Sequence, residues 1–302
     1  MSGPNTSRPL VKSMRETERF EIRLLLESDL PAAMRLKELA RWNQTEDDWR
    51  RLLQLEPRGC FAATLSGKLV GTTTTTTYDG ELAWIGMVLV DPENRRRGIA
   101  TKLMRRALDY LSGKVPTVKL DATSDGKAVY EGLGFEVESL VERWSGIVAA
   151  REENSDNLHT AEQVGNETRR ELLALDQRAF GVDRARLINL LIDNSCAAPV
   201  IFREKDRQLS GYALARRGTD ADYIGPVITA KTEQAAGLLD GVLAQLIGRR
   251  IYIDLNSAFE MGAKVLAERG LIKQRDLIRM SYGARNQTDS RFVFAIAGPE
   301  VG

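Results

Sequence analysis

Residues 84–104 of the chain read WIGMVLVDPENRRRGIATKLM. An apolar run at 84–90 is followed by a turn signal at 91–94, by three arginines and a glycine, and then by the beginning of an amphipathic helix. A strand that leads through a turn to a helix N-terminus offers backbone amides to an anion. The arginines add positive charge, while Gly98 and Ala100 let a bulky phosphate come close to the backbone. This stretch therefore predicts a phosphate-binding loop.

The sequence around this loop alternates between strand and helix patterns. In the first half we expect strands at 21–25, 59–66, 68–78, 82–90, 115–122 and 135–148, and helices through 34–39, from Thr45, at 99–111 and at 124–132. Thr45 is the expected N-cap of the second helix, and Ser124 or Asp125 that of the last. The threonine run at 72–77 predicts a strand, because β-branched residues favour strands. Together these elements predict a mixed α/β sheet.

The second half repeats this order of elements. Helices are expected at 172–180, 185–192, 233–247 and 258–269, and strands at 200–203, 211–216, 223–228, 250–255, 270–282 and 292–297. We therefore expect a disordered leader at 1–19 with Met14 as a candidate start, a domain at 20–150, a linker at 151–165 and a related domain at 166–302. At the position of the arginine loop the second half has neither the arginines nor the glycine, so it is not expected to bind the same anion.

The composition restricts the possible functions. The 302 residues include 43 Lys and Arg against 42 Asp and Glu, so the net charge gives no reason to expect a nucleic-acid partner. No stretch approaches the roughly 20 apolar residues of a membrane span, and the N-terminus lacks the apolar core of a signal peptide. Cys60 and Cys196 lie far apart, which is typical of a protein of the reducing cytoplasm. His159 is the single histidine, which excludes multi-histidine metal sites, and we expect no metal.

The pattern Arg95-x-x-Gly98-x-Ala100 resembles the Arg/Gln-x-x-Gly-x-Gly/Ala signature of the GNAT acetyltransferase superfamily. Tyr130 and Phe135 match that family's Tyr-x-x-x-Gly-Phe motif. Segments at 41–45, 84–90, 120–123, 180–184, 223–226 and 279–283 are similar to a bacterial subgroup with a second, degenerate GNAT-like domain. The resemblance implies two tandem GNAT-like acyl-CoA N-acyltransferase domains, of which the first binds acetyl-CoA.

The resemblance also implies roles for individual residues. The cofactor would be held by the strand before the loop and by the loop itself, at Val88, Leu89, Val90, Arg95, Arg96, Arg97, Gly98, Ile99, Ala100 and Thr101. Tyr130 would protonate the leaving thiolate. The alternative is a tyrosine that only packs beside Phe135. Exchange between a thiol of pKa about 8.5 and a phenol of pKa about 10 is chemically reasonable.

Acetyl transfer to an amine also needs a general base. A lysine-like amine, with pKa about 10.4, is protonated at neutral pH and needs a proton acceptor. Without a usable histidine the acceptor is a carboxylate, a water chain or a backbone carbonyl. Glu81 ranks first among the carboxylates, and the others are Asp79, Glu46, Asp47 and Asp121.

The expected reaction is direct acetyl transfer, in a ternary complex, to a primary amine of a small molecule such as an amino sugar, a polyamine or an amino acid. The second domain would narrow the acceptor pocket, which we expect to include Trp42, Glu46, Asp183, Arg184, Tyr223 and Asp254. The protein would act as a monomer or homodimer. Two alternatives stay open: a non-catalytic acyl-CoA sensor and a protein or peptide N-acetyltransferase.

Overall fold

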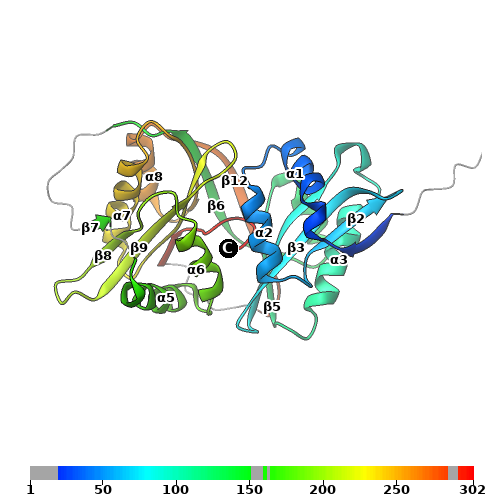
Figure 1. Cartoon of the computed structure of the whole chain (residues 1–302), viewed down its shortest axis with the longest axis horizontal. Coiled ribbons are helices and arrows are strands. Elements are labelled where there is room, and N and C mark those ends of the chain that lie inside the picture. The colour runs from blue at the N-terminus through cyan, green and yellow to red at the C-terminus, as the bar shows by residue number, and fades with distance from the viewer. Residues whose placement is uncertain (1–19, 151–158, 162–163, 285–291) are drawn as a thin grey trace, which may run out of the picture.

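The computed structural model describes residues 20–150, 159–161, 164–284 and 292–302. Its strands form one 13-stranded sheet in the order β1-β2-β3-β4-β5-β12-β6-β11-β13-β10-β9-β8-β7. Figure 1 shows the two halves of the chain side by side, with β6 and β12 between them and the marked C-terminal end at the centre. The expected leader at 1–19 lies outside the described residues.

The first half contains the expected elements in the expected order. Its strands are β1 Glu21–Leu24, β2 Phe61–Leu65, β3 Lys68–Tyr78, β4 Leu82–Val90, β5 Thr117–Ala122 and β6 Glu136–Ile147. Its α-helices are α1 Leu30–Leu39, α2 Glu46–Leu55, α3 Ile99–Leu111 and α4 Ser124–Glu131. Thr45 caps α2 as predicted, since its hydroxyl accepts a hydrogen bond from the Asp48 amide. The prediction for α4 was wrong by one residue, because Thr123 is the N-cap and Ser124 is already helical.

The second half repeats the same series. Its strands are β7 His159–Ala161, β8 Val200–Arg203, β9 Leu209–Arg216, β10 Asp222–Thr229, β11 Arg250–Asn256, β12 Ile272–Gly283 and β13 Val293–Ala295. Its helices are α5 Asn166–Phe180, α6 Ala185–Asp193, α7 Thr232–Gln245 and α8 Glu260–Glu268. Strand β7, which pairs with β8, lies inside the stretch 151–165 that was expected to be a linker. Its three residues are too few to give a strand pattern in a polar sequence.

The two halves exchange their long strands. β12 of the second half pairs with β5, with Ile278 opposite Ala122, while β6 of the first half pairs with β11, with Ile147 opposite Arg250. β6 and β12 also pair with each other along their length. Each half therefore completes the sheet of the other, which alternating patterns in sequence cannot reveal.

One hydrophobic core spans both halves. Side chains of α1 and α2, including Leu36 and Trp49, belong to the same buried cluster as Leu175 of α5 and Leu187 of α6. The opposite face carries two separate clusters, with α3 packed on the first half and α7 and α8 on the second. The shared core and the exchanged strands therefore join the two halves through a continuous packed interface.

None of the helices in the described part of the chain combines the length and apolar character that a bilayer crossing requires.

Candidate active site

A cleft opens where β4 and β5 diverge. These parallel strands pair only from Leu82–Thr117 to Trp84–Lys119, and β4 then continues to Val90 without β5 beside it. On its other edge β5 is occupied by β12. Residues 85–90 of β4 therefore face a gap in the sheet, where their backbone groups can meet an extended ligand.

A β-bulge marks the middle of this edge of the cleft. Thr72 pairs with Leu89 and Thr74 with Gly86, so two residues of β4 lie opposite one residue of β3. Met87 adopts a positive φ of 49° at this point. Its carbonyl accepts a hydrogen bond of 2.8 Å from the Thr72 hydroxyl. One member of the threonine run therefore holds the bulge in place.

The loop after β4 forms an open anion cradle. Asp91 stabilises the turn by accepting from the Glu93 amide, and Arg35 is ion-paired with it. Arg96 and Gly98 both have positive φ, 60° and 79°, which turns successive amides to one side. Gly98 offers no side-chain cap to α3, so the first amides of that helix keep their hydrogen-bonding capacity for an anion.

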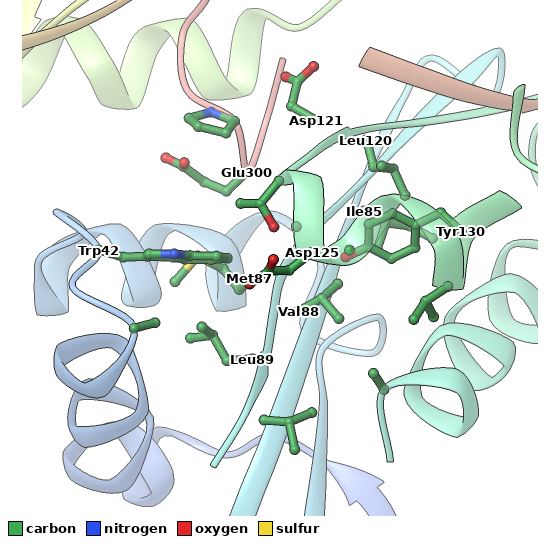
Figure 2. Close-up of a pocket in the computed structure, with 18 of the residues that line it drawn as sticks. Trp42, Ile85, Met87, Val88, Leu89, Leu120, Asp121, Asp125, Tyr130 and Glu300 are labelled. Atoms are coloured by element: carbon green, nitrogen blue, oxygen red, sulfur yellow. The ribbon is translucent and has the colours of Figure 1, made fainter. Parts of the chain in front are cut away.

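The cleft and the loop are joined in a cavity of about 570 Å³. Figure 2 shows Trp42 and Tyr130 on opposite sides of it, with Met87, Val88 and Asp125 between them. All the expected cofactor residues except Arg97 line this cavity, namely Val88, Leu89, Val90, Arg95, Arg96, Gly98, Ile99, Ala100 and Thr101. Arg97 is exposed and donates to Asn94 instead.

Tyr130 lies beside the cleft with its hydroxyl uncommitted. Its ring makes an edge contact with Phe135, with ring centroids 6.2 Å apart. Gly126 leaves room for the ring, because a Cβ there would lie 2.9 Å from it. The hydroxyl forms no hydrogen bond within the described ranges, and burial raises the pKa of Tyr130 to about 12. The group is therefore protonated at physiological pH and available as a proton donor.

The carboxylates expected from sequence to act as base lie mostly elsewhere. Glu81 and Asp79 are exposed in the turn between β3 and β4, and Glu46 and Asp47 are exposed and paired with Arg50. None of these four lines the cavity. Residues 79–81 do lie beside the core strand, as expected. They precede its first residue, Leu82, whereas the bulge lies farther along, at Met87.

Three other carboxylates do line the cavity: Asp121, Asp125 and Glu300. Asp121 is held by Arg279 of β12 through two hydrogen bonds of 2.9 Å, and burial raises the pKa of Asp121. Glu300, 3% exposed, was not anticipated. It accepts from Arg216 and from Gln44, each at 2.9 Å. Burial, together with nearby Asp48, raises the pKa of Glu300 even though Arg216 acts in the opposite direction.

Glu300 reaches the cavity because the last described segment of the chain crosses from the second half to the first. Beyond β13, the Pro299 carbonyl accepts from the Trp84 indole at 3.0 Å and the Val301 carbonyl from the Tyr78 hydroxyl at 2.7 Å. Gly86 permits this contact, since a Cβ at that position would lie 2.6 Å from the Glu300 Cα. The segment therefore packs directly on β4.

The second half also fixes the connection between α1 and α2. The Asn43 amide group donates to the Ala221 carbonyl at 2.8 Å and accepts from the amides of Asp220 and Ala221. Lys37 and Gln44 are both tied to Thr219. This connection carries Trp42 and Gln44 into the cavity wall.

The remaining residues expected in the acceptor pocket lie behind it or away from it. Trp42 lines the cavity, whereas Asp183 is exposed and accepts from the Ala185 amide just before α6. Arg184 is buried in an ion pair with Asp176. Tyr223 and Asp254 do not reach the cavity themselves, but both contact residues that position its wall.

Sequence reasoning missed four polar residues of this wall. They are Gln44, Arg143, Arg275 and Glu300. Arg143 and Arg275 come from the exchanged strands β6 and β12, so only the sheet order places them there. Gln44 entered the sequence analysis only within the segment 41–45 that resembles the bacterial subgroup, without a role.

The corresponding gap in the second half is filled by the chain itself. β10 and β11 also pair over three residues only, from Asp222 to Ile224, and then separate. β13 lies between them, with Ala295 paired to both Val227 and Leu255. Only two residues, Ala230 and Lys231, connect β10 to α7, in place of the long arginine loop.

Neither cysteine is placed for catalysis. Cys60 is fully buried just before β2, with its thiol against the Leu52 and Glu56 carbonyls, and burial raises the pKa of its thiol to about 12. Cys196 likewise has its pKa raised, to about 11, mainly by burial. Within the described ranges His, Cys, Asp and Glu form no group of three that could hold a metal ion.

Comparisons with known proteins agree with this architecture. The family model "Acetyltransferase (GNAT) family" matches residues 23–135, and "Acetyltransferase (GNAT) domain" matches residues 172–295. An acetyltransferase of Pectobacterium atrosepticum is 31% identical over 141 residues, which cover 44% of this chain and 99% of that protein. The uncharacterized N-acetyltransferase YitH of Bacillus subtilis is 25% identical over 285 residues, covering 93% of this chain and 98% of that protein. A crystal structure from Pyrococcus horikoshii has a TM-score of 0.77 at 22% identity, covering 94% and 96%.

Fold and site together define a protein with two related α/β halves and an open cleft beside an anion cradle. The chain belongs to the GNAT acetyltransferase family and contains two GNAT domains in tandem.

Proposed function

We propose that the protein transfers the acetyl group of acetyl-CoA to a primary amine of a small molecule by direct transfer in a ternary complex. The observation that carries this proposal is the continuity of the cavity, which extends from Arg95 and Arg96, past Tyr130, to Trp42 and Glu300. The first half, residues 20–150, would bind the cofactor. The second, residues 166–302, would shape the acceptor pocket and bind no cofactor, because β13 occupies its cleft.

The residues present fit coenzyme A. The amides at the start of α3, with Arg95 and Arg96, suit a pyrophosphate, and the unpaired edge of β4 suits an extended pantetheine arm. When bound, acetyl-CoA supplies an acyl carbon activated by a thiolate leaving group. Backbone amides at the Met87 and Val88 bulge would be the donors to the charge that develops on the acetyl oxygen.

Proton movements follow from the side chains of the cavity. As the C–N bond forms and the C–S bond breaks, the amine loses one proton and the thiolate gains one. We assign the first to Glu300, a buried carboxylate on the acceptor side, and the second to Tyr130, which lies across the cavity from Trp42. Desolvation that raises the pKa of Tyr130 also raises that of a thiol in the same cavity, so the transfer stays feasible.

A small acceptor is favoured over a protein because the acceptor side is walled. The α1–α2 connection is tied to residues 219–221, and the segment at Pro299 and Glu300 packs on β4. An extended peptide would need this wall to open.

Replacing Arg95 and Arg96 together by Ala should raise the KM for acetyl-CoA by about 10- to 100-fold, because each charge-assisted hydrogen bond to phosphate contributes roughly 1.5–3 kcal/mol before solvent exposure reduces it. The KM for the amine should change far less. Arg97→Ala is the matched control, since that arginine does not line the cavity. Equal cofactor affinity in the double variant and the wild type would remove the loop from cofactor binding.

Glu300→Gln should lower kcat/KM for the amine by about 100- to 1,000-fold, the usual range for a lost general base. A base acts when deprotonated, and burial places the pKa of Glu300 above the usual value of about 4.3. At pH values below that pKa, the logarithm of kcat/KM should fall by two units for each unit of decreasing pH. One unit comes from protonation of the amine and one from protonation of Glu300. The variant should keep a slope of one throughout. Glu81→Gln is the control, and a large loss there would return the role of base to Glu81.

The proposed reaction is tested by thiol release from acetyl-CoA over a panel of amines. Tight binding of acetyl-CoA without turnover on any amine would instead support an acyl-CoA sensor. Turnover on peptides alone would support a peptide N-acetyltransferase.

A further inference from the structure

Gln44 carries an unused hydrogen-bond acceptor on the acceptor side of the cavity. Its Nε2 donates to Glu300 Oε2 at 2.9 Å, and because a carboxylate accepts, this contact fixes the orientation of the amide. Oε1 is then left buried without a hydrogen-bond partner among the described residues, and the side chain lines the cavity. An unmet buried acceptor destabilises the protein until a donor reaches it. An N–H group of a ligand would satisfy it.

A row of charged residues crosses three strands at the same side of the cavity. Arg275 of β12 lies directly opposite Arg143 of β6, and Arg143 lies directly opposite Asp254 of β11. Asp254 is fully committed, since it accepts two hydrogen bonds from Arg143, at 2.7 and 2.5 Å, and a third from the Tyr223 hydroxyl at 3.0 Å. The row therefore contains two guanidinium groups and a single carboxylate.

Arg275 is the member of this row whose charge is not compensated. It is exposed, lines the cavity, and forms no ion pair or hydrogen bond with any residue that the structure describes. Burial of part of the side chain and the adjacent charge of Arg143 lower the pKa of Arg275. Like charges directly opposite on neighbouring strands destabilise a sheet. A guanidinium group without an ion-pair partner can donate two parallel hydrogen bonds to a carboxylate or a phosphate.

We propose that the acceptor is a primary amine that also carries an anionic group, a carboxylate or a phosphate. The amine is held between Gln44 Oε1 and Glu300, and the anion is bound by Arg275. This proposal rests on the proposed acetyl transfer and names its substrate class. It restricts the earlier expectation, because amino acids and amino-sugar phosphates satisfy it and polyamines do not.

The remaining charges of the cavity agree with an anionic acceptor. Five arginines line it, of which Arg95 and Arg96 are assigned to the cofactor and Arg143 is ion-paired with Asp254, so Arg41 and Arg275 are left for the acceptor. Of the three lining carboxylates, Asp121 and Glu300 are already ion-paired with Arg279 and Arg216. A polycation would therefore enter a cavity with excess positive charge, which opposes its binding.

The test compares acceptors that differ only in the anion, on the full chain with saturating acetyl-CoA. The pairs are 4-aminobutanoate and butylamine, O-phosphoethanolamine and ethanolamine, and glucosamine 6-phosphate and glucosamine, with spermidine as the polycation. We expect kcat/KM to be at least tenfold higher for the anionic member of one pair or more. The carboxylate and phosphate arms identify which anion is preferred.

Arg275→Gln should reduce that preference by about 10- to 100-fold, the loss expected for a charge-assisted contact. Lys273→Gln is the matched control: it removes one positive charge from the same strand, but Lys273 is paired with Glu142 and Asp276 and does not line the cavity. The Lys273→Gln variant should prefer the anionic acceptors to the same extent as the wild type.

A second measurement is independent of turnover. With coenzyme A present, N-acetyl-4-aminobutanoate or N-acetylglucosamine 6-phosphate should raise the melting temperature more than N-butylacetamide or N-acetylglucosamine, and Arg275→Gln should remove the difference. Equal rates within every pair, a preference for spermidine, or an Arg275→Gln variant with wild-type preference would overturn the proposal. Absence of turnover on every amine refutes the proposed reaction instead, and in that case the melting temperatures decide whether the anion is recognised.

Discussion

Tyr130→Phe should lower kcat for acetyl transfer by about 100- to 1,000-fold, the usual contribution of a positioned general acid. The substitution deletes one oxygen whose hydrogen-bonding capacity no described residue uses. The dissociation constant for acetyl-CoA and the melting temperature should therefore stay close to those of the wild type. Isothermal titration with acetyl-CoA and steady-state thiol release measure the two quantities separately.

Tyr282→Phe provides the control for this variant. Tyr282 belongs to the same aromatic group, with its ring centroid 5.4 Å from that of Phe135, but it does not line the cavity. Its hydroxyl should be dispensable. Because burial raises the pKa of Tyr130 to about 12, the acid stays protonated as the pH rises, and kcat should show no basic limb from this group below about pH 10. Wild-type turnover by Tyr130→Phe would exclude the tyrosine from the reaction.

Arg184→Met should lower the free energy of unfolding by about 3–5 kcal/mol, the usual effect of removing one partner of a buried ion pair. Arg184 donates to both carboxylate oxygens of Asp176, at 2.8 and 3.0 Å, and to the Gly302 carbonyl at 2.8 Å. The variant leaves Asp176, 1% exposed, without its cation. At roughly 2–4 °C per kcal/mol, the melting temperature should fall by about 6–20 °C.

The double variant Arg184→Met, Asp176→Asn separates the ion pair from other contacts of the arginine. Removing the second charge should restore part of the lost stability, because no uncompensated carboxylate then remains buried. Chemical denaturation of the two single variants and the double variant completes the cycle. A single variant within 1 kcal/mol of the wild type would show that the pair contributes little. Arg184 would then have to be reconsidered as part of the acceptor wall.

The cofactor side of the cavity could be predicted from sequence because it is local. The strand, the turn, the arginines and the helix start are contiguous from Trp84 to Met104, and Tyr130 follows after one strand and a short helix. Each of these elements also obeys an ordinary propensity rule, so periodicity and turn residues were sufficient. The order of elements in both halves was predicted for the same reason.

The acceptor side could not be predicted in this way, because its residues come from segments that meet only in the folded chain. Gln44 follows α1, Arg143 lies in β6, Arg275 in β12, and Glu300 follows β13. Which of these charges is paired also depends on the fold: Asp254 neutralises Arg143, whereas Arg275 keeps its charge. Glu81 was ranked first as base because sequence distance from the core strand was the only measure of proximity available.

The exchange of β6 and β12 has a consequence for how the protein is made. A chain emerging from the ribosome can form β1 to β5 early, but the free edge of β5 has no neighbour until residues 272–283 have been synthesised. Until then that edge is exposed and open to pairing with another chain, and closing it requires contacts across some 160 residues, which slows folding. The nascent first half is therefore the stage most open to aggregation, and a gene fragment that ends after β6 should encode an aggregation-prone product.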